Sequence, residues 1–225
     1  MHQKWGKLLF MHWRIEEKEL RPLIPEQLDI DTFDGTAWIG VIPFTMWDIR
    51  ALPPFIPPIP GLSSAHELNV RTYVHYEGVP GVWFFSLDCN SAAAVMAARA
   101  FYHLPYFNAE IELDQRGHKI DYSCKRTDNP PAQFKSSWNI GETIPFSHPD
   151  SLEFFLTERY CLYAEAGGDL YRARIFHQPW PLQQATMNSY TSTVIEALGL
   201  KSHPGSPTVN YCEKLEVEIW PIRRL

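Results

Sequence analysis

The stretch that decides the fold is RAFYHLPYFNA, residues 99–109. It continues a run of residues, 92–98, that is apolar on every side, and Asn90 or Ser91 stands in position to cap a helix ending near His103. A helix that is apolar all round is expected to be buried. The guanidinium of Arg99 then needs a nearby carboxylate, because a buried unpaired charge is costly.

Pairs of strand-like segments joined by short turns surround this stretch. Residues 69–76 and 82–87, 109–113 and 118–124, and 160–165 and 170–177 predict three hairpins, and residues 38–44 and 209–220 predict further strands. Two short helices are predicted at residues 150–155 and 189–198, the second ending at Gly199. The pattern favours an α+β fold that is mainly antiparallel β, curved into a cone-shaped or barrel-like sheet with a few packed helices.

Composition narrows the class of protein. The 225 residues are 45% hydrophobic and 20% charged, which suits one domain spanning residues 1–225. The net charge of −6 and the scattered arginines argue against a nucleic-acid partner. No apolar run is long enough for a secretory signal or a membrane span, so we expect a cytoplasmic protein with no membrane partner.

The cysteines and histidines show no metal-binding pattern. Cys89, Cys124, Cys161 and Cys212 are widely spaced, and reduced thiols are expected. The nine histidines show no spacing typical of a zinc site. We therefore predict no metal and no cofactor.

The proline-rich loop at residues 53–60 has two interpretations. Pro54 and Pro57 form a P-x-x-P pattern, which is typical of ligands for SH3-type modules. The segment is also strongly apolar, and a docking motif should be exposed. We favour a stiff loop lying over the sheet or over the mouth of a barrel.

Residues 99–109 resemble the signature of the acetoacetate decarboxylase-like superfamily. That signature is an arginine, five residues, a proline, two lysines, one residue and an alanine, and Arg99, Pro105 and Ala109 match it without a gap. Tyr106 and Phe107 stand where the family has its two lysines. Upstream, Glu67 resembles the acidic residue that the family places in its pocket.

Within that superfamily, the chain is more similar to the YqjF-like proteins, a family for which we know of no established activity. The resemblance implies a shared fold more than a function. It extends along almost the whole chain, through residues 20–25, 31–35, 67–73, 84–88, 104–106, 157–160 and 177–182.

The missing lysines bear directly on chemistry. Schiff-base decarboxylation needs a primary amine, with a second cation beside it to lower its pKa. Neither the phenol of Tyr106 nor the ring of Phe107 supplies an amine. Lys119 and Lys125 are the nearest lysines in sequence, but they lie among polar residues and are expected to be exposed. We predict that the chain is not a Schiff-base acetoacetate decarboxylase.

A polar set remains as the candidate site. Strand alternation puts Glu67, Asn69, Arg71, Tyr73 and His75 on one face, which either lines a pocket or lies in solvent. The opposite face, with Leu68, Val70, Val74 and Tyr76, is expected to pack. Glu67, Arg71, Arg99 and Tyr106 are the candidate ligand-binding residues, and an arginine suits an anionic ligand. Glu67 and Tyr106 are the catalytic candidates. Glu67 paired with Arg99, and a buried Tyr106 with a satisfied hydroxyl, are the structural alternatives.

Three functions follow from these residues. The first is binding of a small organic molecule, acidic or keto-like, in an apolar pocket with a polar end, with or without a non-imine reaction. The second is a non-catalytic ligand-binding or sensing protein. The third is a structural or interaction module that uses the proline-rich loop 53–60. The sequence leaves open whether the chain forms a homo-oligomer.

Overall fold

A computed structural model of the chain describes residues 1–50, 64–201 and 205–225. Within these residues, thirteen strands form one sheet. The strands are β1 (His2–Ile15), β2 (Asp29–Ile30), β3 (Ala37–Arg50), β4 (Ser64–Tyr76), β5 (Val79–Cys89), β6 (Tyr106–Arg116), β7 (Lys119–Arg126), β8 (Gln133–Thr143), β9 (Cys161–Ala166), β10 (Asp169–His177), β11 (Gln183–Ser192), β12 (Thr208–Ile219) and β13 (Arg223–Arg224).

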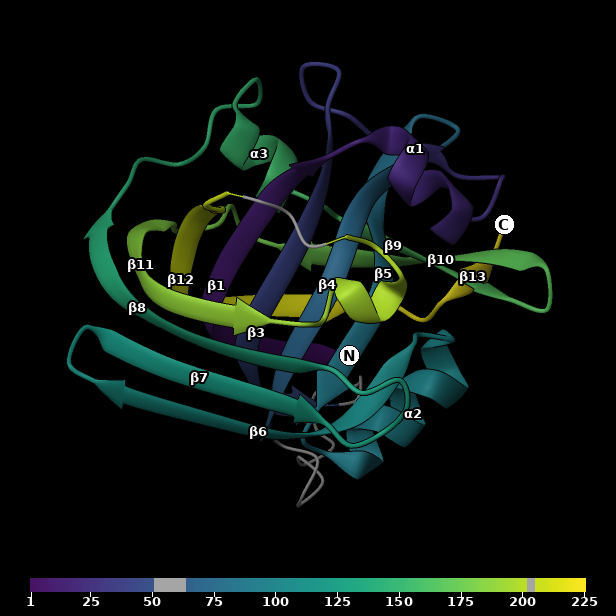
Figure 1. Ribbon diagram of the computed structural model, residues 1–225. Coiled ribbons are helices and arrows are strands. Elements are labelled where there is room, and N and C mark those ends of the chain that lie inside the picture. Colours follow the sequence, from purple (N-terminus) through teal and green to yellow (C-terminus); the bar gives the residue numbers. More distant parts are fainter. Residues whose placement is uncertain (51–63, 202–204) are drawn as a thin grey trace.

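The helices are short and lie at two ends of the sheet. Figure 1 shows α1 and α3 on the side opposite to α2. Helix α2 begins after Ser91, whose Oγ accepts a hydrogen bond from the backbone N–H of Ala94, so the predicted cap is confirmed. The helices are α1 (Glu17–Leu20), α2 (Ala92–Tyr102) and α3 (Leu152–Thr157), with 3₁₀ turns at Arg21–Leu23 and Glu196–Leu198.

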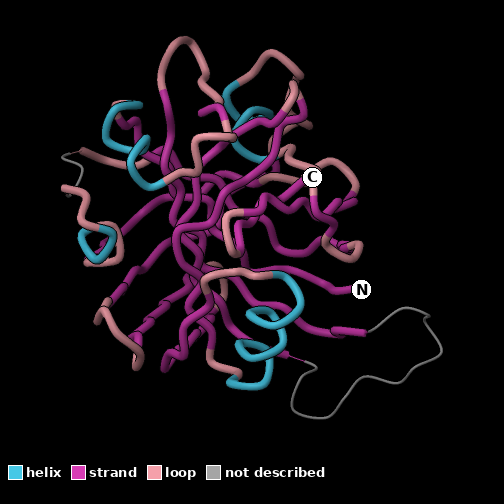
Figure 2. The backbone as a smooth tube through the Cα atoms, turned by 90° about the vertical axis from the view of Figure 1, so that its right-hand side faces the viewer, coloured by secondary structure: helices cyan, strands magenta, loops and turns pink. Residues whose placement is uncertain are grey.

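The sheet closes into two rings that share a wall. The order β5-β6-β7-β8-β11-β12-β1-β3-β4 returns to its start because β4 also pairs with β5. A second ring forms because β10 pairs with both β12 and β9, and β9 pairs with β5. Figures 1 and 2 show the long, curved strands of this sheet. Most pairings are antiparallel, whereas β5 pairs parallel with β6 and β9, so the predicted curved, mainly antiparallel sheet is confirmed.

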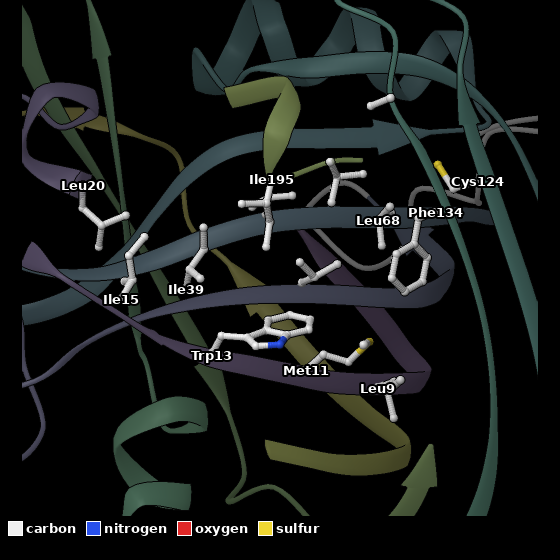
Figure 3. Packing of buried hydrophobic residues seen from close by; sticks show 14 of the residues in the cluster. Leu9, Met11, Trp13, Ile15, Leu20, Ile39, Leu68, Cys124, Phe134 and Ile195 are labelled. Carbon is white, nitrogen blue, oxygen red and sulfur yellow. The ribbon is translucent and has the colours of Figure 1, made fainter. Parts of the chain in front are cut away.

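The shared wall has a core on each of its faces. On β1, Leu9, Met11 and Trp13 belong to one cluster of buried side chains, shown in Figure 3, whereas Leu8 and Phe10 belong to the other. This is the period-2 alternation of a strand that is buried on both sides.

Strand β4 alternates in the same way. Leu68, Val70 and Val74 face the first cluster, as the sequence predicts, and Tyr73 faces the second. The side chains of Glu67, Asn69 and Arg71 therefore also point toward the second interior.

The three predicted hairpins are confirmed as β4–β5, β6–β7 and β9–β10. The predicted helix at residues 189–198 is wrong. Its first half belongs to β11, where Ser189 to Ser192 pair with β8, and its second half is the 3₁₀ turn that ends at Gly199 in a left-handed conformation. Tyr190 and Thr191 favour a strand, and the Ser192 hydroxyl accepts a hydrogen bond from the backbone N–H of Val194, where the strand ends.

The expectation that α2 is buried all round is also wrong. Val95 is its one buried residue, and Met96 and Phe101 are 66% and 71% exposed. The helix lies across the open end of the second interior instead of inside a core, so only one of its faces is covered.

The four cysteines are buried and free, as predicted. None of the helices in the described part of the chain is long and apolar enough to span a membrane. The predicted proline-rich loop 53–60 lies outside the described residues, so its role stays a prediction.

Candidate functional site

A cavity of about 660 Å³ lies in the second interior, on the side that α2 covers. Most of its wall is apolar and comes from strands that are distant in sequence, because the ring closure brings them together. Residues that line it include Trp5, Leu8, Ile42, Phe44, Met46, Leu162, Ile175, Trp180, Ala97, Ala98 and Phe101. A cavity of this size and character suits a small organic molecule.

Three polar side chains from β4 form a row along one wall of this cavity. Glu67, Asn69 and Arg71 all line it. Their Cα atoms follow one another at roughly 6–7 Å, because every second residue of a strand points to the same face. The irregularity in the β4–β5 pairing lies on β5, where Phe85 is the extra residue, so the row on β4 is uninterrupted.

Glu67 is 2% exposed and has hydrogen-bond donors on both carboxyl oxygens. The Tyr106 hydroxyl donates to Oε2 at 2.6 Å, and Asn69 Nδ2 lies 3.4 Å from Oε1. Burial outweighs these bonds and raises the pKa of Glu67 to about 7. The carboxyl group therefore changes its charge near neutral pH, which is the range in which a general acid or base is effective.

Arg71 is 9% exposed and donates from a single nitrogen, Nη2, to the backbone oxygen of Leu156 at 3.1 Å and to the hydroxyl of Tyr73 at 3.4 Å. Its buried Nε has no hydrogen-bond partner among the described residues. Arg71 also takes part in none of the ion pairs found in that part of the chain. Residues 51–63 and 202–204 contain no Asp or Glu.

The surroundings of Arg71 leave its charge unbalanced. Its guanidinium carbon lies 5.6 Å from the ring centres of both Phe10 and Tyr73. Nε2 of the buried His12 lies 2.6 Å from the Tyr73 hydroxyl, and burial holds the pKa of His12 well below its ordinary value. The groups that contact Arg71 are therefore neutral or aromatic, and the nearby Arg159, 5.0 Å from the Tyr73 ring, is paired with Asp31. An anion that enters the cavity meets the guanidinium of Arg71 without a counter-ion.

Arg99 lies away from the cavity. Its Nη2 pairs with Asp128 at 3.0 Å and its Nε donates to the backbone oxygen of Tyr106 at 2.8 Å, while its side chain is 47% exposed. The expected Arg99–Glu67 pair is therefore not formed. Arg99 pairs with a carboxylate on the loop after β7, and its hydrogen bond to Tyr106 links α2 to the start of β6. Its predicted role in ligand binding stays a prediction.

The two aromatic residues at the lysine positions face different surroundings. Tyr106 lines the cavity and contacts Glu67. The ring of Phe107 lies 4.1 Å from the guanidinium carbon of Arg126, which forms a buried ion pair with Asp88 at 2.5 and 3.0 Å. The two positions therefore supply a phenol to the cavity and a ring to a buried ion pair.

Among the described residues, the side chains that line the cavity supply no lysine amine and no metal-binding cluster, and the α-amino group of Met1, which also lines it, donates a hydrogen bond to the backbone oxygen of Ile219 at 2.7 Å. No three His, Cys, Asp or Glu side chains in the described part of the chain are placed to hold a metal ion. Lys119 is half exposed and pairs with Asp121, and Lys125 is exposed, as the sequence predicts.

Several wall residues were not predicted. Gln3, Trp5 and Leu8 come from β1, which was not expected to be a strand. Trp180 also lines the cavity, and its buried Nε1 has no hydrogen-bond partner among the described residues. The alternation in residues 2–15 was the available signal, but it is obscured because both faces of β1 are apolar.

Sequence comparison places this geometry among known proteins. Residues 2–216 match the model of a family, DUF2071, described as an uncharacterized conserved protein. The uncharacterized protein YqjF of Bacillus subtilis (strain 168) is 41% identical over 224 residues, which cover 100% of this chain and 92% of that protein.

Solved structures share the fold at low sequence identity. The enduracididine biosynthesis enzyme MppR, complexed with pyruvate, has a TM-score of 0.69 and 11% identity over 99% of this chain and 89% of that one. An acetoacetate decarboxylase-like enzyme from Sphingomonas wittichii RW1 has a TM-score of 0.66 and 11% identity over 100% and 92%. An acetoacetate decarboxylase from Legionella pneumophila subsp. pneumophila str. Philadelphia 1 has a TM-score of 0.60 and 11% identity over 100% and 86%. The predicted fold is confirmed.

Proposed function

The chain belongs to the DUF2071 family, and on that premise we propose that it binds a small organic acid in the cavity of the second ring. The carboxylate of the ligand binds the guanidinium of Arg71, and its apolar body packs against the aromatic and aliphatic wall. The observation that carries this proposal is the unpaired charge of Arg71, which is nine-tenths buried.

Energetics support an anionic ligand. A buried cation without a counter-ion is costly, and an anion that binds beside it removes part of that cost. A carboxylate matches the planar fork of a guanidinium and takes two hydrogen bonds from it. MppR, which shares the fold, has been solved with pyruvate, itself a small organic acid.

The apolar wall supports a ligand with a hydrocarbon body. Trp5 packs against both Phe44 and Trp180 beside the cavity, with ring centres 5.4 Å apart for Trp5 and Phe44 and 6.4 Å apart for Trp5 and Trp180. Such aromatic surfaces contribute free energy of binding through the burial of apolar area. A short, fully polar acid would leave most of this surface in contact with water.

Isothermal titration with octanoate, an acid with a carboxylate and an apolar chain, tests the proposal. We expect Arg71→Met to weaken binding roughly 10- to 100-fold, the usual effect of losing a hydrogen bond to a charged group. Arg99→Met should leave the affinity close to that of the unchanged chain, because Arg99 lies outside the cavity. Arg116→Met, at the exposed end of β6, is the control for removal of any arginine. Equal affinities for the Arg71 and Arg116 variants would refute the proposal.

A second candidate function is proton transfer by Glu67, favoured by its pKa of about 7 and its contact with Tyr106. A carboxylate beside a bound oxo acid takes a proton from the carbon next to the carbonyl group, and the electron pair moves onto the carbonyl oxygen. Return of a deuteron from heavy water then labels that carbon. Proton NMR of 7-oxooctanoate, whose carbonyl group lies far from its carboxylate, measures the exchange in heavy water, and Glu67→Gln should remove the acceleration. Exchange at the same rate with and without protein would exclude this function for that acid.

A further inference from the structure

We propose that the bound acid carries a hydroxyl group several carbons away from its carboxylate, and that this hydroxyl donates a hydrogen bond to Asn69 Oδ1. This inference rests on the proposed function, because it takes the carboxylate to bind at Arg71. It adds the chemical class of the ligand: a hydroxy acid whose two polar groups lie far apart along an apolar chain.

The first observation is a hydrogen-bond acceptor in the cavity wall that has no donor. Asn69 is 4% exposed, and its Oδ1 has no hydrogen-bond partner among the described residues. Its Nδ2 points to Glu67, which fixes the orientation of the amide with the oxygen away from that carboxyl. A buried acceptor without a donor is destabilising, so a ligand that supplies the donor gains affinity.

The second observation is the chemistry of the neighbouring groups. The Tyr106 hydroxyl is engaged as a donor to Glu67, and the Glu67 carboxylate accepts. Neither of these two groups offers a hydrogen-bond donor to Asn69 Oδ1, so the ligand has to supply one. A ketone oxygen only accepts hydrogen bonds, whereas a hydroxyl donates as well as accepts.

The third observation is the distance between the polar groups. The Cα atoms of Asn69 and Arg71 are roughly 6–7 Å apart, and those of Glu67 and Arg71 roughly 13 Å. Both hydrogen bonds of Arg71 run toward Leu156 and Tyr73, which is the direction away from Glu67 along β4. The carboxylate therefore binds toward α3, and Asn69 and Glu67 lie toward α2. A hydroxyl on the carbon next to the carboxylate does not span this separation.

Positional isomers of one acid test the inference without any change to the protein. Isothermal titration compares octanoate with 2-hydroxyoctanoate, 6-hydroxyoctanoate and 8-hydroxyoctanoate, which differ only in the presence and place of one hydroxyl. We expect the 6- or the 8-isomer to bind roughly 3- to 10-fold more tightly than octanoate, the usual gain from one buried hydrogen bond. The 2-isomer should bind no more tightly than octanoate.

Variants of Asn69 test the assigned partner. The ratio of the octanoate and 8-hydroxyoctanoate dissociation constants should fall to about one in Asn69→Leu, which removes the acceptor at similar volume. Asn69→Ala serves the same purpose if the first variant does not fold. Glu112→Gln, on the exposed face of β6, should keep the ratio of the unchanged chain.

The outcomes separate this inference from the proposed function. Binding of octanoate that depends on Arg71, with no advantage for the 6- or 8-isomer, would overturn the hydroxy-acid inference alone. A 2-isomer that binds most tightly would overturn it as well. Absence of any Arg71-dependent binding would overturn the proposed function and this inference together.

Discussion

Glu67→Gln should change how the stability of the protein depends on pH. Gln keeps the shape of the side chain and can still accept the hydrogen bond of Tyr106, but it does not titrate. In the folded chain the pKa of Glu67 is raised to about 7 by burial, whereas its ordinary value is 4.5. Between these two values the folded state holds a proton that the unfolded state has lost, so the free energy of unfolding falls as the pH rises.

The magnitude follows from these two values. They differ by 7 − 4.5 = 2.5 pH units, which corresponds to a total loss of about 3 kcal/mol as the pH rises from below 4.5 to above 7. Most of this loss, roughly 2.5 kcal/mol, falls between pH 5 and pH 8. The Gln variant does not undergo this loss. Its free energy of unfolding, relative to that of the unchanged chain, should therefore rise by roughly 2.5 kcal/mol between pH 5 and pH 8.

Urea unfolding followed by circular dichroism at pH 5, 6, 7 and 8 measures the effect. The difference between the two proteins isolates Glu67, because His12 and the other titrating groups are common to both. Glu112→Gln is the matched control, since Glu112 is exposed on β6. Parallel stability profiles for the unchanged chain and Glu67→Gln would show that Glu67 does not hold its proton near neutrality.

Two further predictions concern the buried ion pair and the missing amine. Arg126→Met leaves the fully buried Asp88 carboxylate unpaired and should lower the free energy of unfolding in urea by about 3–5 kcal/mol. Arg116→Met breaks an exposed pair with Asp114 and should lower it by under about 1 kcal/mol. Equal losses would contradict the structural role of the buried pair. Borohydride treatment with acetoacetate should add no mass to the unchanged chain, whereas Tyr106→Lys places an amine beside Glu67 and should give a reduced adduct in mass spectrometry. An adduct on the unchanged chain would refute the absence of imine chemistry.

Local signals predicted the parts of the fold that depend on local chemistry. The turn Glu77–Gly78 adopts positive φ values of 50° and 76°, and a glycine at the second position suits the β4–β5 hairpin. Ser91 caps α2 as expected. These features involve residues within a few positions of one another, so the sequence alone was sufficient.

The closing of the two rings was not predictable in this way. β1 is paired with both β12 and β3 and is apolar on both faces, which hides the alternation of a strand. β11 carries Ser, Thr and Asn, and it is a strand because β8 pairs along its length. Its conformation depends on a partner some fifty residues away, and no local pattern reports such pairing.

The candidate site was predictable to the extent that it follows strand alternation. Glu67 and Arg71 lie on one face of β4, and both line the cavity. The placement of Arg99 depended on Asp128, which lies 29 residues away in the chain. The unpaired atoms of Asn69 and Trp180 appear only when the neighbours from other strands are in place.

A crystal structure of the protein with octanoate tests the central claim most directly, because it shows where the carboxylate binds. The account predicts the carboxylate within hydrogen-bond distance of Arg71 Nε, with the hydrocarbon chain running along β4 past Asn69 toward α2. A carboxylate bound at Arg99, or an acid bound outside the cavity and making no contact with Arg71, would contradict this account.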